Sequence, residues 1–293
     1  MVRCAQGTVV TSPAIDRSLD RPVVLAEQPY VLPPDLAAIQ PEVLALDRSV
    51  PGAQSFNGLN AGLSDDLDPA GGDARLQPVR YFDTMASTYL AGEQWRTGTL
   101  AGVSADITHH LFTADGRLVP LSKNDLSNQI GVSTVALTLD GWMLLLHQGL
   151  GSRSSPGLIA PSGSGSLEPK DIIGKTRLPE AVSTGMEREL REELGLLTPA
   201  MRRIPLETTV LGFARWLDKG AKPEFYGTTR IHAEMADIDL SIHESELEYV
   251  GRHEPIPPAT VARLRAGEAF STLGRGALSV PLEMCLNRVF VNH

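Results

Sequence analysis

Apolar residues recur every three or four positions in several stretches of the chain. Residues at this spacing fall on one side of a helix, so each stretch predicts an amphipathic helix with one face on a core. Proline stands at or near the start of most of them, where the first helical turn tolerates it. The predicted helices are Pro34–Asp47, Val79–Trp95, Pro179–Leu194, Pro258–Ala269 and Ala277–Val291.

Runs of β-branched and aliphatic residues predict strands between these helices. In the run from 131 to 147 the turn dipeptide Asp140-Gly141 favours a β-hairpin, and Asp115-Gly116 favours another within Leu111–Leu121. Two further strands are expected at Glu207–Trp216 and Gly227–Met235. Strands that alternate with helices favour an α/β sandwich with a mixed sheet.

The pattern of predicted loops, strands and helices changes near residue 125. Loops rich in Gly, Asn, Asp and Ser interrupt the first part, whereas the second part alternates strands and helices more regularly. We therefore expect an N-terminal accessory module of α+β type over residues 1–125 and a second domain over residues 126–293.

The composition fits a globular protein and excludes several classes. Of 293 residues, 42% are hydrophobic and 21% are charged, so the chain can bury a core. The net charge is -9 and no basic run dominates, which argues against a nucleic-acid partner. The two cysteines, Cys4 and Cys285, exclude a disulfide framework and a cysteine-based zinc site. The sequence shows neither a signal peptide nor an apolar run of the ~18 residues that a membrane span needs, so we expect a cytoplasmic protein with no membrane partner.

Three glutamates share one edge of the helix expected at Pro179–Leu194. Glu189, Glu192 and Glu193 are spaced i, i+3 and i+4 at the margin of its apolar face. Like charges at this spacing repel, and partly buried carboxylates need a positive partner. Neighbouring arginines such as Arg188 are one such partner, and a divalent cation that prefers oxygen ligands, Mg²⁺ or Mn²⁺, is the other. An ordinary solvated helix is the alternative interpretation.

The segment Gly174–Leu196 as a whole resembles the Nudix box. Five residues separate Gly174 from Glu180, and seven more separate Glu180 from the run Arg188-Glu189-Leu190-x-Glu192-Glu193-x-Gly195-Leu196, so no fixed position is missing. Average residue usage puts a chance match in such a chain on the order of 10⁻⁷. The hairpin before the segment and the strands after it also follow the order of Nudix domains.

The resemblance implies a Nudix α/β/α sandwich and a divalent-metal-dependent pyrophosphatase, a hydrolase of nucleoside diphosphates linked to another moiety. In this family the residues matching Glu189, Glu192 and Glu193 bind the metal, Mg²⁺ or Mn²⁺. The residue matching Glu192 or Glu193 serves as base or holds the metal that activates water. The arginine matching Arg188 orients these carboxylates, and the glutamate matching Glu180 supports that arginine.

Further candidates lie outside the box. Nudix proteins usually carry a Pro-Gly-Gly turn whose backbone carbonyl binds metal, and here Gly163 is our candidate for that carbonyl, with Gly165 of the same longer Gly/Ser segment as the alternative. A flexible surface loop is the equal alternative for this segment. Arg153, among serines, is a candidate phosphate-binding side chain.

Candidates also follow the box. The piece that contains Lys222, Glu224 and Phe225 is often seen in this family, and we expect these three residues to bind substrate, with Glu224 as an additional base or metal ligand. The alternative for Glu224 is an ordinary glutamate on the surface of a loop, without a functional role. His109-His110 and His232 could bind metal, but they lack a further ligand at a suitable spacing, so we expect structural or exposed roles.

The box does not identify the substrate. Phe56-Asn57-Gly58, Tyr81-Phe82-Asp83 and Thr88, ahead of a Nudix-like domain, are similar in layout to two-domain UDP-sugar-hydrolysing Nudix proteins. The alternative is that these residues only hold an accessory module together. We expect a nucleoside diphosphate derivative as substrate, and a homodimer as one form of assembly. The competing function is a non-catalytic Nudix-fold ligand sensor or interaction module, which would have no need of three metal-facing glutamates.

Overall fold

The hairpin predicted around Asp140-Gly141 lies inside the larger of two sheets, where neither of its strands is the outermost one. Its strands β6 (Gly131–Thr138) and β7 (Met143–Gln148) run antiparallel, and Gly141 has a φ of 87°. A glycine adopts this left-handed conformation without the steric cost that a side chain would add. The hairpin prediction is therefore confirmed.

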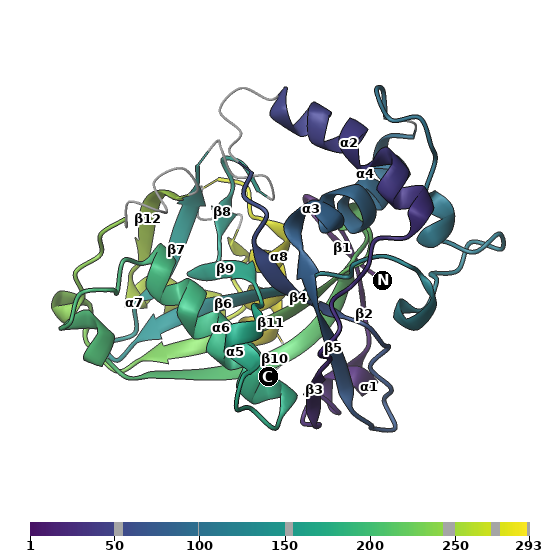
Figure 1. The fold of residues 1–293 in the computed structure, drawn as a ribbon. Coiled ribbons are helices and arrows are strands. Elements are labelled where there is room, and N and C mark those ends of the chain that lie inside the picture. Colours follow the sequence, from purple (N-terminus) through teal and green to yellow (C-terminus); the bar gives the residue numbers. More distant parts are fainter. Residues whose placement is uncertain (50–54, 99, 150–154, 243–249, 271–275, 292–293) are drawn as a thin grey trace.

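The structure is a computed structural model that describes all residues except 50–54, 99, 150–154, 243–249, 271–275 and 292–293. The described residues form a nine-stranded sheet in the order β1-β2-β10-β11-β6-β7-β12, in which β8 also pairs with β7 and β9 with β6. A three-stranded sheet, β3-β5-β4, lies beside it (Figure 1). In the large sheet β11 and β6 are parallel and the other pairs are antiparallel, which confirms the expected mixed sheet. The remaining strands are β1 (Val2–Cys4), β2 (Gly7–Thr11), β3 (Val23–Leu25), β4 (Leu59–Leu63), β5 (Ala74–Arg80), β8 (Ile159–Ala160), β9 (Gly163–Ser166), β10 (Leu206–Trp216), β11 (Lys222–Ile231) and β12 (Val250–Ile256).

Helices cover both faces of the large sheet. Along β7, Leu144 and Leu146 pack in one apolar cluster with Leu190 of α6, whereas Met143 and Leu145 pack in another with α7 and α8. This alternation is what a strand buried on both faces requires. The α-helices are α1 (Pro13–Asp16), α2 (Pro34–Arg48), α3 (Tyr81–Thr84), α4 (Leu90–Thr97), α5 (Pro169–Ile172), α6 (Leu178–Glu193), α7 (Pro258–Arg265) and α8 (Val280–Leu286). Short 3₁₀ turns are η2 (Thr108–His110), η3 (Leu121–Lys123), η4 (Met201–Arg203), η5 (Leu217–Lys219) and η6 (Met235–Asp237), and π-helical turns are η1 (Met85–Tyr89) and η9 (Asn287–Val291).

Three predicted elements differ in the structure. The helix expected at Val79–Trp95 begins only at Tyr81, because Val79 and Arg80 pair with β4 as the end of β5, and it continues as α3, η1 and α4. The hairpin expected within Leu111–Leu121 is reduced to a single bridge between Phe112 and Leu118. The strand expected at Gly227–Met235 begins earlier, at Lys222, so Lys222, Glu224 and Phe225 lie within β11.

Elements of the N-terminal part are hydrogen-bonded to the second part of the chain. Strand β2 pairs with β10, and Ala61 of β4 donates its amide to the carbonyl of Leu167 at 2.7 Å. Leu63 and Leu76 of the small sheet share one apolar cluster with Val182 of α6. The small sheet thus packs against α6, while the division into modules at residue 125 stays a prediction. Among the described helices, none combines the length and apolar character that a membrane span requires.

Candidate active site

The segment that resembles the Nudix box forms a loop, a helix and a loop. Gly174 and Gly195, which bracket α6, have φ values of 76° and 71°. Both positions favour glycine, because a side chain there would be strained. At Gly195 a Cβ would also lie 1.7 Å from the carbonyl oxygen of Ser241. Pro179 stands in the first turn, and buried Val182, Met186 and Leu190 form the apolar face, as the sequence predicts.

Strand β9 lies unusually close to α6. A Cβ at Gly163 would be 2.5 Å from the amide nitrogen of Leu190, and a Cβ at Gly165 would be 2.2 Å from the carboxyl carbon of Glu189. Only glycine leaves this space, so the Gly-Ser-Gly-Ser sequence is explained by the approach of a helix. The segment also pairs with β6 from Gly131 to Thr134, so it is a strand and not a flexible loop.

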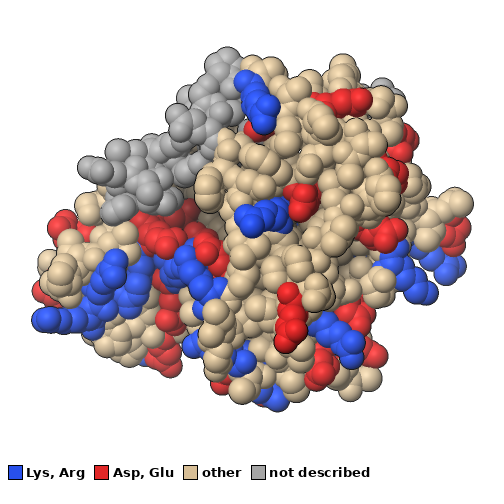
Figure 2. Space-filling view, viewed as in Figure 1, with Lys and Arg blue, Asp and Glu red and all other residues tan. Residues whose placement is uncertain are grey.

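The carboxylates of α6 are held by the backbone of β9. Glu193 accepts a hydrogen bond from the amide of Ser164 at 2.8 Å, and Glu189 accepts one from the amide of Ser166 at 3.1 Å. Glu193 is only 4% exposed, whereas the side chain of Glu192 is 33% exposed. The acidic edge of α6, meaning Glu189, Glu192 and Glu193, therefore runs from a buried end to a solvent-facing one. Figure 2 shows acidic side chains gathered beside basic ones over the region where α6 lies in Figure 1.

Arg188 lies among these carboxylates. Its Nη1 donates to Glu189 at 2.9 Å and to Glu192 at 3.1 Å, while its Nη2 donates to the carbonyl of Ser166 at 2.7 Å. Burial on its own lowers the pKa of Arg188, but the charge of Glu189 and the hydrogen bonds and charge of Asp171 outweigh it, so the net shift is upward. The guanidinium thus stays charged and compensates the acidic edge.

Asp171, and not Glu180, supports Arg188 in the structure. The Oδ2 atom of Asp171, a residue only 2% exposed, accepts from Nη2 of Arg188 at 3.0 Å. Glu180 instead accepts from the amides of Thr176 and Arg177, both at 3.2 Å, and so caps the start of α6. The two residues have different partners because they lie at different places relative to Arg188. Glu180 stands in the first turn of the helix, where free amides need an acceptor, whereas α5 brings Asp171 alongside Arg188.

A buried polar chain leads from the acidic edge to Lys222. The hydroxyls of Ser164 and Ser133 lie 3.0 Å apart, and Ser133 donates to Glu224 at 2.9 Å. The other oxygen of Glu224 accepts from Nζ of Lys222 at 2.6 Å. Both charged residues are less than 10% exposed, and an ion pair this buried is stable only because each partner compensates the other. Lys222 and Glu224 are thereby joined to the acidic edge through two serines.

The structure places the remaining predicted site residues in different environments. Phe225 is fully buried in the core, with its ring centroid 5.0 Å from that of Phe213, so it offers no surface to a substrate. Its strand is buried on both faces, and the alternation of side chains places Phe225 in the apolar cluster that contains Met186 of α6. Gly163 lies beside α6 on β9, as described above. Arg153 lies outside the described residues.

Sequence reasoning did not find several residues that contact the site. Asp171, Ser133 and Ser164 are described above, and His253 of β12 donates from Nε2 to the carbonyl of Glu193 at 3.0 Å. For Asp171 a signal existed, because Glu168 and Asp171 form a capping box at the start of α5. The serines and His253 belong to different strands, and only the fold brings them to α6.

The donor set of the acidic edge fits a hard divalent cation. Carboxylate oxygens are ligands that Mg²⁺ and Mn²⁺ prefer, and the side chains of Glu189, Glu192 and Glu193 supply them along the edge of α6 that lies against β9. Nε2 of Gln129 donates to the hydroxyl of Ser166 at 2.6 Å, while its buried carboxamide oxygen has no hydrogen-bond donor among the described residues. Because Arg188 holds two of the carboxylates, metal binding there requires these side chains to share or exchange partners.

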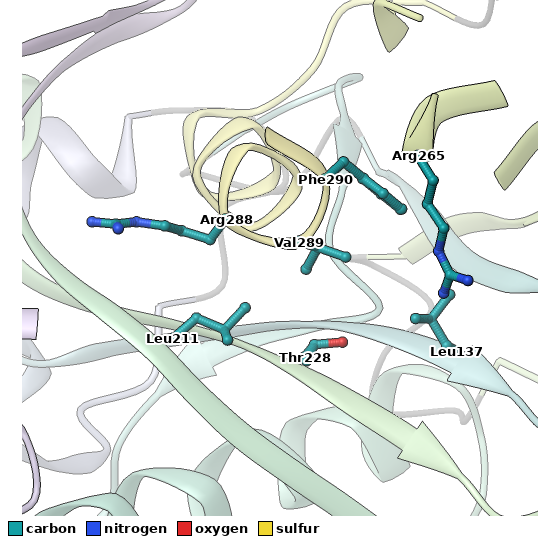
Figure 3. Close-up of a pocket in the computed structure, with 7 residues that line it drawn as sticks. All are labelled: Leu137, Leu211, Thr228, Arg265, Arg288, Val289 and Phe290. Atoms are coloured by element: carbon teal, nitrogen blue, oxygen red, sulfur yellow. The ribbon is translucent and has the colours of Figure 1, made fainter. Parts of the chain in front are cut away.

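The structure also contains a pocket of about 470 Å³ on the opposite face of the large sheet (Figure 3). Leu137 and Leu211 at its floor pack with the α7 and α8 cluster, and Arg288 at its rim already pairs with Asp16. Of the predicted site residues that the structure describes, none lines it. The pocket is therefore separate from the acidic edge.

Comparisons with known proteins found likenesses in structure only. No family model matches the chain, and no curated protein matches its sequence. The crystal structure of DR0079 from Deinococcus radiodurans matches with a TM-score of 0.34 and 15% identity, covering 55% of this chain and 82% of that one. The MutT protein from Methanosarcina mazei Go1 matches with a TM-score of 0.32 and 19% identity, covering 55% and 91%. At these values neither match indicates what this chain binds. The described fold, a mixed sheet with helices on its faces, is of the α/β class that the Nudix resemblance implies.

Proposed function

We propose that this chain is a Nudix pyrophosphohydrolase that uses Mg²⁺ or Mn²⁺ to cleave the pyrophosphate bond of a nucleoside diphosphate linked to another moiety. The observation that carries the proposal is the arrangement of the complete box. It folds as one loop, helix and loop, with Glu189 and Glu193 fixed against β9 by backbone amides. Such preorganised oxygen ligands are what a hydrolytic metal site needs.

The chemistry of the bond explains the need for a cation. A pyrophosphate is anionic and repels nucleophiles, and a bound Mg²⁺ or Mn²⁺ supplies neutralisation and a more acidic water. Glu189, Glu192 and Glu193 would hold it. Arg188 keeps their side chains oriented through the contacts described above, and the backbone amide of Ser164 fixes the buried Glu193.

Each glutamate has a role that its exposure favours. Glu193, nearly fully buried, can hold a ligand or accept a proton only at a fixed position, since its side chain has little freedom. Glu192 reaches solvent, so it can meet an incoming substrate. Buried Lys222 and Glu224 act from behind the site and not on the substrate, because neither is accessible.

An active enzyme is a better explanation of the acidic edge than a ligand sensor. Holding three carboxylates on one helical edge costs stability through repulsion and desolvation. The chain offsets part of this cost with the positive charge of Arg188, which Asp171 holds in place, and keeps all three acids. A module that only bound a ligand would gain nothing from keeping all three.

The test is a hydrolysis screen of the full chain with Mg²⁺ or Mn²⁺. The panel contains UDP-sugars, other nucleoside diphosphate sugars, dinucleotides and nucleoside triphosphates, and phosphate is measured after coupling to a phosphatase. We expect turnover of at least one nucleoside diphosphate derivative, abolished by a chelator, with UDP-sugars as the first candidates from the layout of Asn57 and Tyr81. Binding of panel members without hydrolysis would contradict the proposal and favour a sensor.

A further inference from the structure

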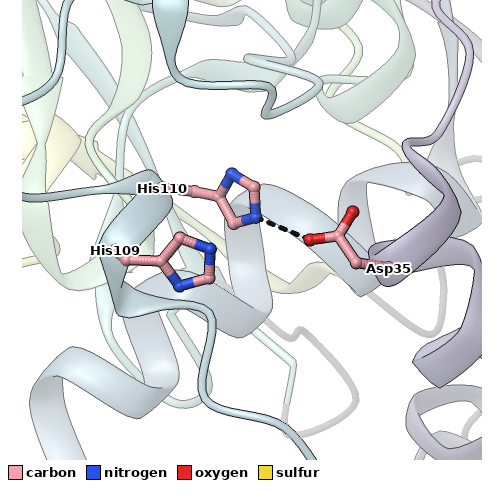
Figure 4. A group of neighbouring side chains, drawn as sticks. All are labelled: Asp35, His109 and His110. Atoms are coloured by element: carbon pink, nitrogen blue, oxygen red, sulfur yellow. Dashed lines mark hydrogen bonds and ion pairs between the residues drawn. The ribbon is translucent and has the colours of Figure 1, made fainter.

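A second group of potential metal ligands lies in the N-terminal part, on elements separate from α6. Asp35 stands in the first turn of α2, and His109 and His110 lie in the short turn η2. Each residue offers one ligand atom, and these atoms lie within 4.8 Å of one another. Among the described residues this is the one group of three or more histidine, cysteine or acidic side chains that meets that condition. Figure 4 shows both imidazoles on the side of η2 that faces Asp35.

The two imidazoles are held in a defined arrangement. Their ring centroids are 4.1 Å apart with an angle of 38° between the planes, which places them one over the other. His110 is 9% exposed, so its ring is fixed by packing, whereas His109 and Asp35 are open to solvent. The group therefore has one buried anchor and an accessible side through which an ion can enter.

His110 has a carboxylate at each ring nitrogen. Its Nε2 lies 3.1 Å from Oδ2 of Asp35, and its Nδ1 lies 3.9 Å from Oδ2 of Asp125. Histidines that bind metals through one nitrogen commonly direct the other at a carboxylate, which fixes the tautomer and increases the basicity of the ligating nitrogen. With Asp125 on the Nδ1 side, Nε2 is the nitrogen available on the side of Asp35 and His109.

The surrounding charge favours a cation. Besides Asp35 and Asp125, Asp106 lies close to His109, and its carboxylate accepts from the amide and hydroxyl of Thr108 at 2.8 and 2.7 Å. Those two hydrogen bonds hold the turn that carries both histidines. Three carboxylates thus surround two imidazoles, an excess of negative charge that a divalent ion would neutralise.

We propose that Asp35, His109 and His110 form a binding site for a divalent transition metal of the Zn²⁺ type. Two imidazole nitrogens and one carboxylate oxygen suit Zn²⁺, whereas Mg²⁺ prefers oxygen ligands alone. Three protein ligands leave a fourth position for water on the exposed side. Because the ligands come from α2 and η2, 74 residues apart in sequence, the ion links these two elements. This site shares no residue with the acidic edge of α6 and does not depend on the proposed hydrolase activity.

The test is Zn²⁺ binding by isothermal titration calorimetry to the metal-free full chain, with excess Mg²⁺ present to occupy oxygen-only sites. We expect the wild type to bind Zn²⁺, and H109A and D35N to bind it at least tenfold more weakly. The matched control is H232A, because His232 is also partly exposed and pairs with a single carboxylate, Glu207. Its Zn²⁺ affinity should equal that of the wild type.

Several results would overturn the proposal. They are the absence of Zn²⁺ binding to the wild type, undiminished binding to H109A and D35N, or loss of binding in H232A. A second measurement guards against misfolded variants. Zn²⁺ should raise the melting temperature of the wild type but not that of H109A, whose circular dichroism should match the wild type, since His109 is exposed. An equal rise in H109A would also contradict the site.

Discussion

Asp171 binds the guanidinium of Arg188 from outside the helix that carries it. Its carboxylate accepts from Nε at 3.1 Å and from Nη2 at 3.0 Å, while Nη1 of the same guanidinium points to Glu189 and Glu192. Arg188 therefore connects a buried anchor on α5 to the acidic edge of α6. The position of the proposed metal ligands depends on a residue that is not part of the box.

Replacement of Asp171 should affect both stability and turnover. In D171N the buried Arg188 loses its most buried charge partner, and breaking a buried pair of this kind costs about 3 kcal/mol. We expect that loss in the free energy of unfolding by urea, and slower turnover because Arg188 no longer orients Glu189 and Glu192. K170A is the control, since Lys170 is exposed and Glu168 is its one ion-pair partner among the described residues. A D171N protein as stable and as active as K170A would show that Asp171 does not hold Arg188.

The close approach of β9 to α6 predicts the effect of one added methyl group. In G165A the new Cβ would meet the carboxylate of Glu189 and displace it. A displaced ligand loses its geometry, and shifts of about 1 Å can cost on the order of 10²-fold in rate. We expect that reduction in kcat, measured at saturating metal. S183A, which changes a hydroxyl bonded only within α6, should keep wild-type activity. Full activity of G165A would place the reactive carboxylates elsewhere.

The stability of the protein should depend on pH through Glu187. Burial raises the pKa of Glu187 above its ordinary value of 4.5, and a hydrogen bond from Thr208 and the charge of Arg191 only partly offset the effect. The folded protein thus holds this proton more tightly than the unfolded chain does. The associated stability is fully present below pH 4.5 and is lost as the pH rises through the folded pKa.

The variant E187Q mimics the protonated carboxyl at every pH. Its melting temperature should therefore exceed that of the wild type at pH 8, by roughly 1–3 °C for a chain of this size, and the difference should vanish at pH 4. Thermal unfolding at both pH values measures this. A difference of the same size at pH 4 would exclude the titration of Glu187 as its cause.

Hydrophobic periodicity and turn residues correctly predicted those elements whose conformation depends mainly on their own local sequence. The periodicity of Val182, Met186 and Leu190 predicted α6, and Asp140-Gly141 predicted the central hairpin. The Gly/Ser run at β9 gave no such signal. Its glycines are explained by the space that α6 leaves, which is a tertiary property. Likewise, Val79 and Arg80 were expected to begin a helix but form the end of β5, because their pairing with β4 outweighed the helical periodicity.

The sequence predicted which residues form the acidic edge of α6 better than it predicted which residues contact them. Glu193 was expected at the buried margin and is buried, since helical geometry alone fixes that relation. Arg188 bonds to Glu189 and Glu192 of α6, but the residue expected to support it was Glu180, whereas Asp171 of α5 bonds to it. His109-His110 gave no metal prediction, because the third ligand, Asp35, is distant in sequence and is brought there by the fold. The metal and catalytic roles of Glu189, Glu192 and Glu193 stay predictions.

Direct counting of bound Mn²⁺ tests the central claim, which is that the acidic edge of α6 binds a divalent cation. Electron paramagnetic resonance of the free ion would give the occupancy of the wild type, of E193Q and of E187Q, each on an H109A background that removes the other proposed site. We predict that E187Q binds Mn²⁺ as the parent does, whereas E193Q binds it at least tenfold more weakly and with turnover lowered by about 10²-fold. Equal Mn²⁺ binding by E193Q and E187Q would contradict the account.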